Sequence, residues 1–117
     1  MDIETIRGFC LSLPFVTEAF PFDHSTLVFK VGGKIFALID VDSFSFINLK
    51  CEPEIAIELR ERFDGVRPGY HMNKKHWNSV YIQSDLSEKQ LLELISSSYD
   101  LVYQSLPKKI KDELTLG

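Results

Sequence analysis

The chain lacks the basic excess that a dedicated DNA-binding protein usually carries. Its 117 residues hold 13 lysines and arginines against 17 acids, which gives a formal net charge of −4. Counterion release supplies much of the affinity of DNA-binding proteins, and it requires phosphate-neutralising cations. The composition therefore argues against a protein that coats duplex DNA through phosphate contacts alone.

Cysteine and long apolar runs are also scarce. The two cysteines, Cys10 and Cys51, lie far apart and form no CxxC pair, and no segment reaches the eighteen or more apolar residues of a membrane span. Residues 1–5 are acidic and contain no signal-peptide run. These absences favour a cytoplasmic protein with free thiols and no membrane partner, although a Cys10–Cys51 disulfide stays open as an alternative. The length suits a single domain over residues 1–117, which we expect to be a monomer.

Catalytic and metal-binding motifs are missing as well. There is no GxSxG or HExxH motif, and Gly32-Gly33-Lys34 is followed by Ile35 where a phosphate-binding loop needs a hydroxyl. His71 and His76 have no cysteine or acid nearby to complete a zinc site. We therefore expect no catalytic residue, metal or cofactor, and no enzyme.

One segment stands out against this acidic background. Residues 65–84 contain three basic side chains, two histidines and no acid. Aromatic rings interleaved with cations are what single-stranded nucleic acid uses for base stacking and phosphate contacts. We predict a nucleic-acid- or anion-binding site over residues 66–78, with two strand lysines beside it: Arg67, Tyr70, His71, Asn73, Lys74, Lys75, His76, Asn78, Lys30 and Lys50. Trp77 is predicted to anchor this segment to the core, since a lone tryptophan beside a strand usually buries its ring.

The apolar spacing predicts the secondary structure. Helices are expected over residues 3–13, from Glu52-Pro53-Glu54 to Gly65, from a Ser87/Gln90 capping box to Pro107, and for one or two turns after it. Strands are expected over residues 26–31, 34–40, 44–50 and 79–83. Gly32-Gly33 predicts a two-residue hairpin turn, and this register pairs Phe29 with Phe36 and Leu27 with Leu38 on the face that the helices cover.

This element order predicts an α+β fold of two layers, in which helices gather on one face of an antiparallel sheet. The opposite face would carry Lys30, Asn48 and Lys50 and would stay open to solvent or a partner.

Several segments resemble the MmcQ/YjbR family of small bacterial proteins. The hallmark is the run Val66–Asn78, and further similarity lies in residues 11–14, 27–34, 48–51 and 98–102. The resemblance implies a bacterial cytoplasmic protein with a fold similar to the frataxin-like (CyaY-like) α+β sandwich. It also implies the family's label of DNA-binding protein, which is attached to a double-wing arrangement of strands.

Three functions follow, in order of preference. The first is weak, salt-sensitive DNA binding through the 66–78 segment. The second is binding of a small anionic ligand by the same segment, and the third is protein interaction through the open sheet face.

Overall fold

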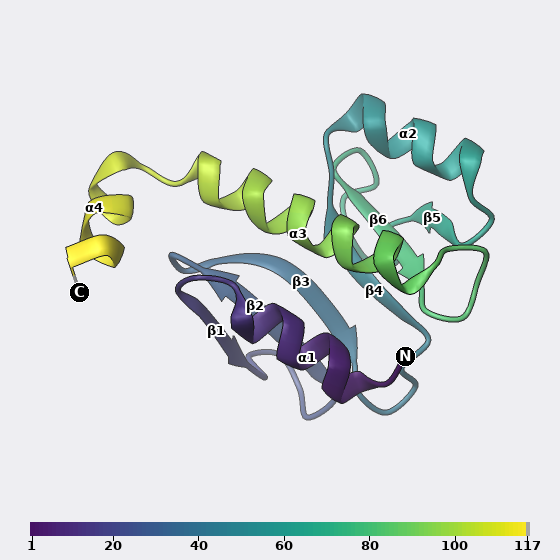
Figure 1. The fold of residues 1–117 in the computed structure, drawn as a ribbon, viewed down its shortest axis with the longest axis horizontal. Coiled ribbons are helices and arrows are strands. Elements are labelled where there is room, and N and C mark those ends of the chain that lie inside the picture. Colours follow the sequence, from purple (N-terminus) through teal and green to yellow (C-terminus); the bar gives the residue numbers. More distant parts are fainter. Residues whose placement is uncertain (117) are drawn as a thin grey trace.

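Six antiparallel strands form one sheet, and helices pack on one side of it. The computed structural model describes residues 1–116. Its elements are α1 (Ile3–Ser12), β1 (Val16–Ala19), β2 (Thr26–Val31), β3 (Lys34–Asp40), β4 (Phe46–Lys50), α2 (Pro53–Arg62), β5 (Val66–Pro68), β6 (Trp77–Tyr81), α3 (Glu88–Ser105) and α4 (Lys108–Leu116). The strand order is β1-β2-β3-β4-β6-β5, and Figure 1 shows α1 and α3 lying across one side of this sheet. The predicted two-layer α+β architecture is confirmed.

The helix boundaries follow the capping signals in the sequence. The Asp2 side chain accepts the Thr5 N–H at 2.9 Å and begins α1. Ser87 and Gln90 form the predicted capping box at the start of α3. Pro53 occupies the first turn of α2, where its missing N–H is not needed.

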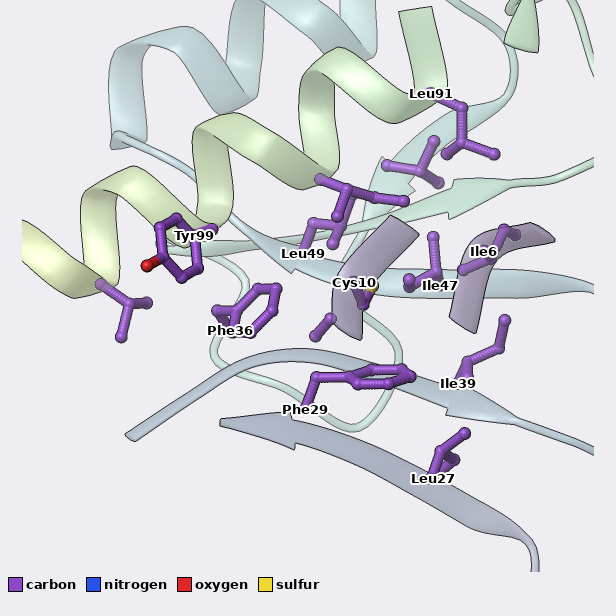
Figure 2. Close-up of a cluster of buried hydrophobic side chains, with 14 of the residues drawn as sticks. Ile6, Cys10, Leu27, Phe29, Phe36, Ile39, Ile47, Leu49, Leu91 and Tyr99 are labelled. Carbon is purple, nitrogen blue, oxygen red and sulfur yellow. The ribbon is translucent and has the colours of Figure 1, made fainter. Parts of the chain in front are cut away.

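The core lies between the sheet and the helices α1 and α3. Ile6 and Cys10 from α1 and Leu91 and Tyr99 from α3 pack above strand side chains such as Phe29 (Figure 2). The Tyr99 hydroxyl donates to the Pro14 carbonyl at 2.6 Å, so the phenol is buried without losing a hydrogen-bond partner. Ile6, Cys10, Phe29 and Ile95 are completely buried.

The predicted register of the β2–β3 hairpin is wrong beyond its first pairs. Val31 does pair with Lys34, but the register shifts and Phe29 pairs with Ala37, not with Phe36. The shift leaves Phe36 as an extra residue in β3, which is the signature of a β-bulge. As a result Ile39 joins the core, and Leu38 turns to the other face of the sheet.

The two edge strands were not predicted from the sequence. β1 is four residues long and follows Phe15, whose φ of 66° makes a sharp turn after α1. β5 has three residues and lies in the segment 66–78, for which the sequence predicts a binding site and no strand before residue 79. β1 is held by a charge pair from α1, in which Arg7 donates to both carboxylate oxygens of Glu18 at 2.7 and 2.5 Å.

No helix among residues 1–116 is long and apolar enough to cross a membrane. The tail after Pro107 forms α4, a helix of nine residues.

Candidate nucleic-acid interface

The outer sheet face, opposite the helices, is built from one cross-strand row. Val28 pairs with Leu38, Leu38 with Asn48, Asn48 with Ser79, and Ser79 with Arg67. Directly paired residues point to the same face of a sheet, so this row runs from β2 to β5 on the outer face. The row is the floor on which the predicted site is built.

The segment between β5 and β6, here called the 69–76 loop, covers part of this floor. Four central residues of the row, Val28, Leu38, Asn48 and Ser79, are each at most 8% exposed although no helix lies over them. The expectation that this face stays open is therefore wrong in its centre. Local sequence patterns do not predict this cover, because a loop and not a regular element lies over Asn48 and Ser79.

A closed set of hydrogen bonds fixes the loop to the outer face. The Tyr70 N–H donates to the Ser79 Oγ at 2.8 Å, and the Ser79 hydroxyl donates to the Asn48 Oδ1 at 2.5 Å. The Asn48 Nδ2 then donates back to the Tyr70 carbonyl at 3.2 Å. Both backbone polar groups of Tyr70 are therefore held by buried side chains, and the position of its ring is preset.

The two rings at the tip of the loop lie together at the surface. Tyr70 is 59% exposed, and its ring centroid lies 4.1 Å from that of His71. On its other side Tyr70 meets the edge of Phe46 at 5.9 Å. His71 has a φ of 57°, which turns the chain sharply after Tyr70. The outcome is an exposed pair of rings on a fixed backbone.

The basic side chains of this region differ in whether an intramolecular hydrogen bond already engages their charged group. Lys75 is exposed, whereas the Lys74 ammonium donates to the Gly69 carbonyl at 2.9 Å inside the loop. Arg67 is exposed and lies over the Tyr81 ring at 5.2 Å. Arg67 and Lys75 are therefore the better phosphate-binding groups.

The strand lysines lie on the outer face, as predicted. Lys30 alternates with the core residues Phe29 and Val31, and Lys50 pairs with Trp77 beyond the end of the loop. Both are half-buried.

Asn73 and His76 both take part in hydrogen bonds that shape the loop, although Asn73 is exposed. The Asn73 Oδ1 accepts the N–H groups of Lys75 at 2.9 Å and His76 at 3.3 Å, which is an Asx-type turn. The His76 carbonyl accepts the Cys51 N–H at 2.8 Å and joins the loop to the end of β4.

Asn78 does not face the site, which corrects its predicted role. It is 2% exposed, and its Oδ1 accepts the Arg60 Nε–H at 2.6 Å from α2. Its Nδ2 donates to the Ala56 carbonyl at 3.4 Å. Asn78 is two positions before the core residue Val80, so the strand alternation directs it towards the helices.

Trp77 supports the loop through its backbone. Its carbonyl accepts the Gly69 N–H at 2.9 Å and also a hydrogen bond from Arg60. The indole is half-buried and, among the described residues, is not one of the side chains that pack against the core. Arg60, which also donates to the Lys74 carbonyl, is a second support that the sequence analysis missed.

A hollow of about 530 Å³ opens beside the loop on the outer face. The rings of Phe22, Phe46 and Tyr70 line it, and the carboxylates of Asp23 and Asp40 stand in its wall. Hydrogen bonds from Thr26 and Ser25 hold the pKa of Asp23 below its ordinary value. The hollow is thus aromatic, with two aspartates on one side and the loop residues Tyr70, His71 and Met72 on the other.

A second hollow, of about 580 Å³, lies on the helical side between α2 and α3. Its lining is mostly aliphatic, with Ile55, Leu59 and Leu94 among its residues. In residues 1–116 no group of three or more His, Cys, Asp or Glu side chains is placed to hold a metal ion.

The fold and the loop define a small α+β domain with an aromatic, basic loop on the outer face of its sheet. A model of the YjbR family matches residues 11–101, and the chain belongs to this family. It is 44% identical over 115 residues to the uncharacterized protein YbdF of Escherichia coli O157:H7, covering 97% of this chain and 94% of that one. It is 31% identical to the uncharacterized protein YjbR of Escherichia coli K12, with 93% of both chains covered.

Solved structures show the same fold. A crystal structure of the Deinococcus radiodurans protein DR2400, with domain DUF419, superposes with a TM-score of 0.90 at 38% identity and covers 97% of this chain and 88% of that one. A crystal structure of a Pseudomonas syringae protein gives a TM-score of 0.74 at 27% identity, covering 87% of this chain and 99% of the other.

Proposed function

We propose that the chain binds single-stranded or locally distorted DNA through the 69–76 loop and Arg67. The observation that carries this proposal is the exposed Tyr70–His71 ring pair, which the Asn48 and Ser79 side chains hold in place. An exposed ring on a fixed backbone can stack on a base at little further entropy cost, and such stacking contributes about 1–3 kcal/mol per base. In duplex DNA the bases are already stacked on each other, so unpaired bases are the better partner.

Cations precede and follow the ring pair in the chain. Arg67 can hold a phosphate through two parallel hydrogen bonds, and Lys75 provides a point charge. Lys30, Lys50, Lys74 and His76 extend the positive potential around them. Because the whole chain carries a net charge of −4, we expect the affinity to be weak and strongly dependent on salt.

The family resemblance supports related proposals. It suggests a cytoplasmic location, a fold similar to the CyaY-like α+β sandwich, and DNA binding through a double-wing arrangement of strands. Each of these is compatible with the sheet and the loop described above.

A small anionic ligand remains the second candidate. The supporting observation is the combination of Arg67, Lys75 and two histidines around one loop. The hollow next to the loop is a poor anion site, however, because the carboxylates of Asp23 and Asp40 would repel an anion. We therefore place this candidate below nucleic-acid binding.

The test is fluorescence anisotropy with a 12-nucleotide single strand and its duplex over a salt series. We expect the single strand to bind more tightly, and log affinity to fall linearly with log salt. The variants Arg67→Ala and Lys75→Ala should each reduce the slope by about one, the value for one lost phosphate contact. Tyr70→Ala should weaken binding about tenfold or more at every salt concentration, while Tyr70→Phe keeps the ring and the affinity.

Lys89→Ala is the matched control for charge. Lys89 lies on α3 in the helix layer, where it pairs with Glu93 at 3.9 Å. It should leave both the affinity and the slope unchanged. Undetectable binding at low salt, or equal slopes for the unchanged chain and the Arg67→Ala and Lys75→Ala variants, would contradict the proposal.

A further inference from the structure

The hollow beside Tyr70 adds a second exposed ring, Phe22, and two aspartates, which the DNA-binding proposal does not use. Its walls carry aromatic rings, and Phe22 is 65% exposed and Tyr70 is 59% exposed although both border a concave surface. Its rim carries the carboxylates of Asp23 and Asp40. Flat apolar walls suit a planar aromatic group, and a carboxylate accepts hydrogen bonds but donates none when ionised.

The two carboxylates differ in their free acceptor capacity. Asp23 is engaged through both oxygens, since Oδ1 accepts the backbone N–H groups of Ser25 and Thr26 and Oδ2 accepts the Thr26 hydroxyl. Asp40 uses only Oδ1, which accepts the N–H groups of Asp42 at 2.9 Å and Ser43 at 3.1 Å. Within residues 1–116, the Asp40 Oδ2 accepts no hydrogen bond.

Asp40 points into the hollow because of its place in the sheet. It pairs with Thr26 at the end of the β2–β3 ladder, two positions after Leu38 on the outer face. Thr26 and Leu38 line the same hollow. Asp40 therefore lines this space with a side chain that two backbone donors hold through Oδ1, which leaves the Oδ2 as an available acceptor.

We infer that the hollow receives one unstacked nucleobase that carries an exocyclic amino group, such as cytosine or adenine. The inference rests on the proposed function and names the partner more narrowly. The volume of about 530 Å³ lies within the range of small-ligand sites, about 300–1,000 Å³. Phe22 and Tyr70 supply faces and edges for the ring, and the Asp40 carboxylate accepts from the amino group. Thymine has no exocyclic amino group, and its one donor, the ring N3–H, is flanked by two carbonyl oxygens that the same carboxylate repels.

The experiment uses a 12-nucleotide dT strand in which only one central nucleotide is changed. The central position carries dT, dC, dA or a purine nucleotide identical to dA but without its amino group. A charge-assisted hydrogen bond predicts about tenfold or more tighter binding of the dC and dA strands than of the all-dT strand. The purine without the amino group should lose this advantage over dA.

Two variants and one control locate the effect. Asp40→Asn keeps an oxygen for the Asp42 and Ser43 N–H groups but replaces the free carboxylate oxygen with an amide N–H₂, so the dC and dA strands should lose their advantage. Phe22→Ala removes an exposed ring at no cost to the core and should weaken binding of the dC and dA strands more than of dT. Asp42→Asn makes the same charge change on the neighbouring exposed residue and should keep the preference.

The outcomes separate this inference from the function it rests on. If all central bases bind equally, or if Asp40→Asn and Asp42→Asn retain the same preference, the base-pocket inference is wrong and DNA binding stands. If no strand binds at low salt, DNA binding itself is wrong, and the inference fails with it.

Discussion

The Ser79 hydroxyl lies 2.8 Å from the Tyr70 nitrogen and accepts its N–H, although nine positions separate the two residues in the chain. Ser79 is 1% exposed and lies in β6, whereas Tyr70 is at the tip of the loop that returns over the sheet. The bond therefore connects the buried floor of the candidate site to its most exposed ring. The contact explains how a loop can present aromatic groups with a fixed geometry.

Replacing Ser79 tests this connection. In Ser79→Ala the Tyr70 N–H and the Asn48 Oδ1 both lose their hydrogen-bond partner while the loop still covers this part of the sheet. Leaving buried polar groups unpaired should lower the free energy of unfolding by about 1–3 kcal/mol. Urea denaturation followed by tryptophan fluorescence measures this change, and Ser97→Ala, an exposed position on α3, is the control. Equal stability of the two variants would mean that the hydroxyl does not hold the loop.

Arg60 should matter to the loop although it lies on α2. Its guanidinium donates to the Asn78 side chain and to the carbonyls of Lys74 and Trp77. Arg60→Ala leaves these acceptors unpaired in a half-buried site, so we expect a loss of about 1–3 kcal/mol in the free energy of unfolding. Arg62→Ala changes the same charge on the same helix, at a position exposed to solvent. It should cost less than about 0.5 kcal/mol in the same urea titration. A similar loss in both variants would assign the effect to the charge of α2 and not to the loop.

The sequence was sufficient for the elements that depend on local signals. The caps of α1 and α3, the Gly32-Gly33 turn and the existence of the main strands all follow from residues within a few positions of each other. Both glycines of the turn have positive φ, 58° and 82°, which is why the turn could be predicted. The helices also lie on the predicted side of the sheet, over Leu27, Phe29 and Phe36.

Features that depend on distant packing were not accessible in the same way. The bulge at Phe36 gives Phe29 the partner Ala37 and brings Ile39 into the core, and no local pattern predicts it. The short edge strand β5 is stabilised by its pairing with β6, not by its own three residues. The buried role of Asn78 could have been found, because starting the strand at Trp77 and counting back from Val80 places it on the helical face.

Lowering the pH should reduce the free energy of unfolding, partly because Asp85 becomes protonated. Its carboxylate accepts the N–H groups of Gly65 and Asp64, each at 2.9 Å, and these bonds hold its pKa below the ordinary value of 3.8. A lowered pKa in the folded state means that this stabilisation is fully present above about pH 4 and is lost as pH falls through the folded pKa. Asp2 and Asp23 behave in the same way, because they also accept backbone hydrogen bonds.

The measurement is the urea midpoint between pH 6 and pH 2.5. Asp85→Asn keeps one acceptor oxygen but no longer titrates, so its midpoint should fall less steeply in acid than that of the unchanged chain. Asp100→Asn, an exposed change on α3, should leave the steepness as it was. If Asp85→Asn and the unchanged chain have parallel pH profiles, Asp85 is not one of the groups that couple folding to pH.

The two thiols should differ sharply in reactivity. Both cysteines are free in the structure. Cys10 lies in the core, and its burial raises the pKa of the thiol to about 12. Cys51 is half-buried just after β4. Its burial and the nearby Glu52 carboxylate also raise the pKa of its thiol, so the thiolate is scarce but can be reached by solvent.

At pH 8 a disulfide reagent should therefore modify one thiol per native chain, slowly, and the second only after unfolding in urea. Cys51→Ser should abolish the native reaction while leaving one thiol in urea. Two thiols reacting at the same rate in the native protein would show that α1 opens from the core, and no reactive thiol in urea would reveal a disulfide in place of the two free cysteines.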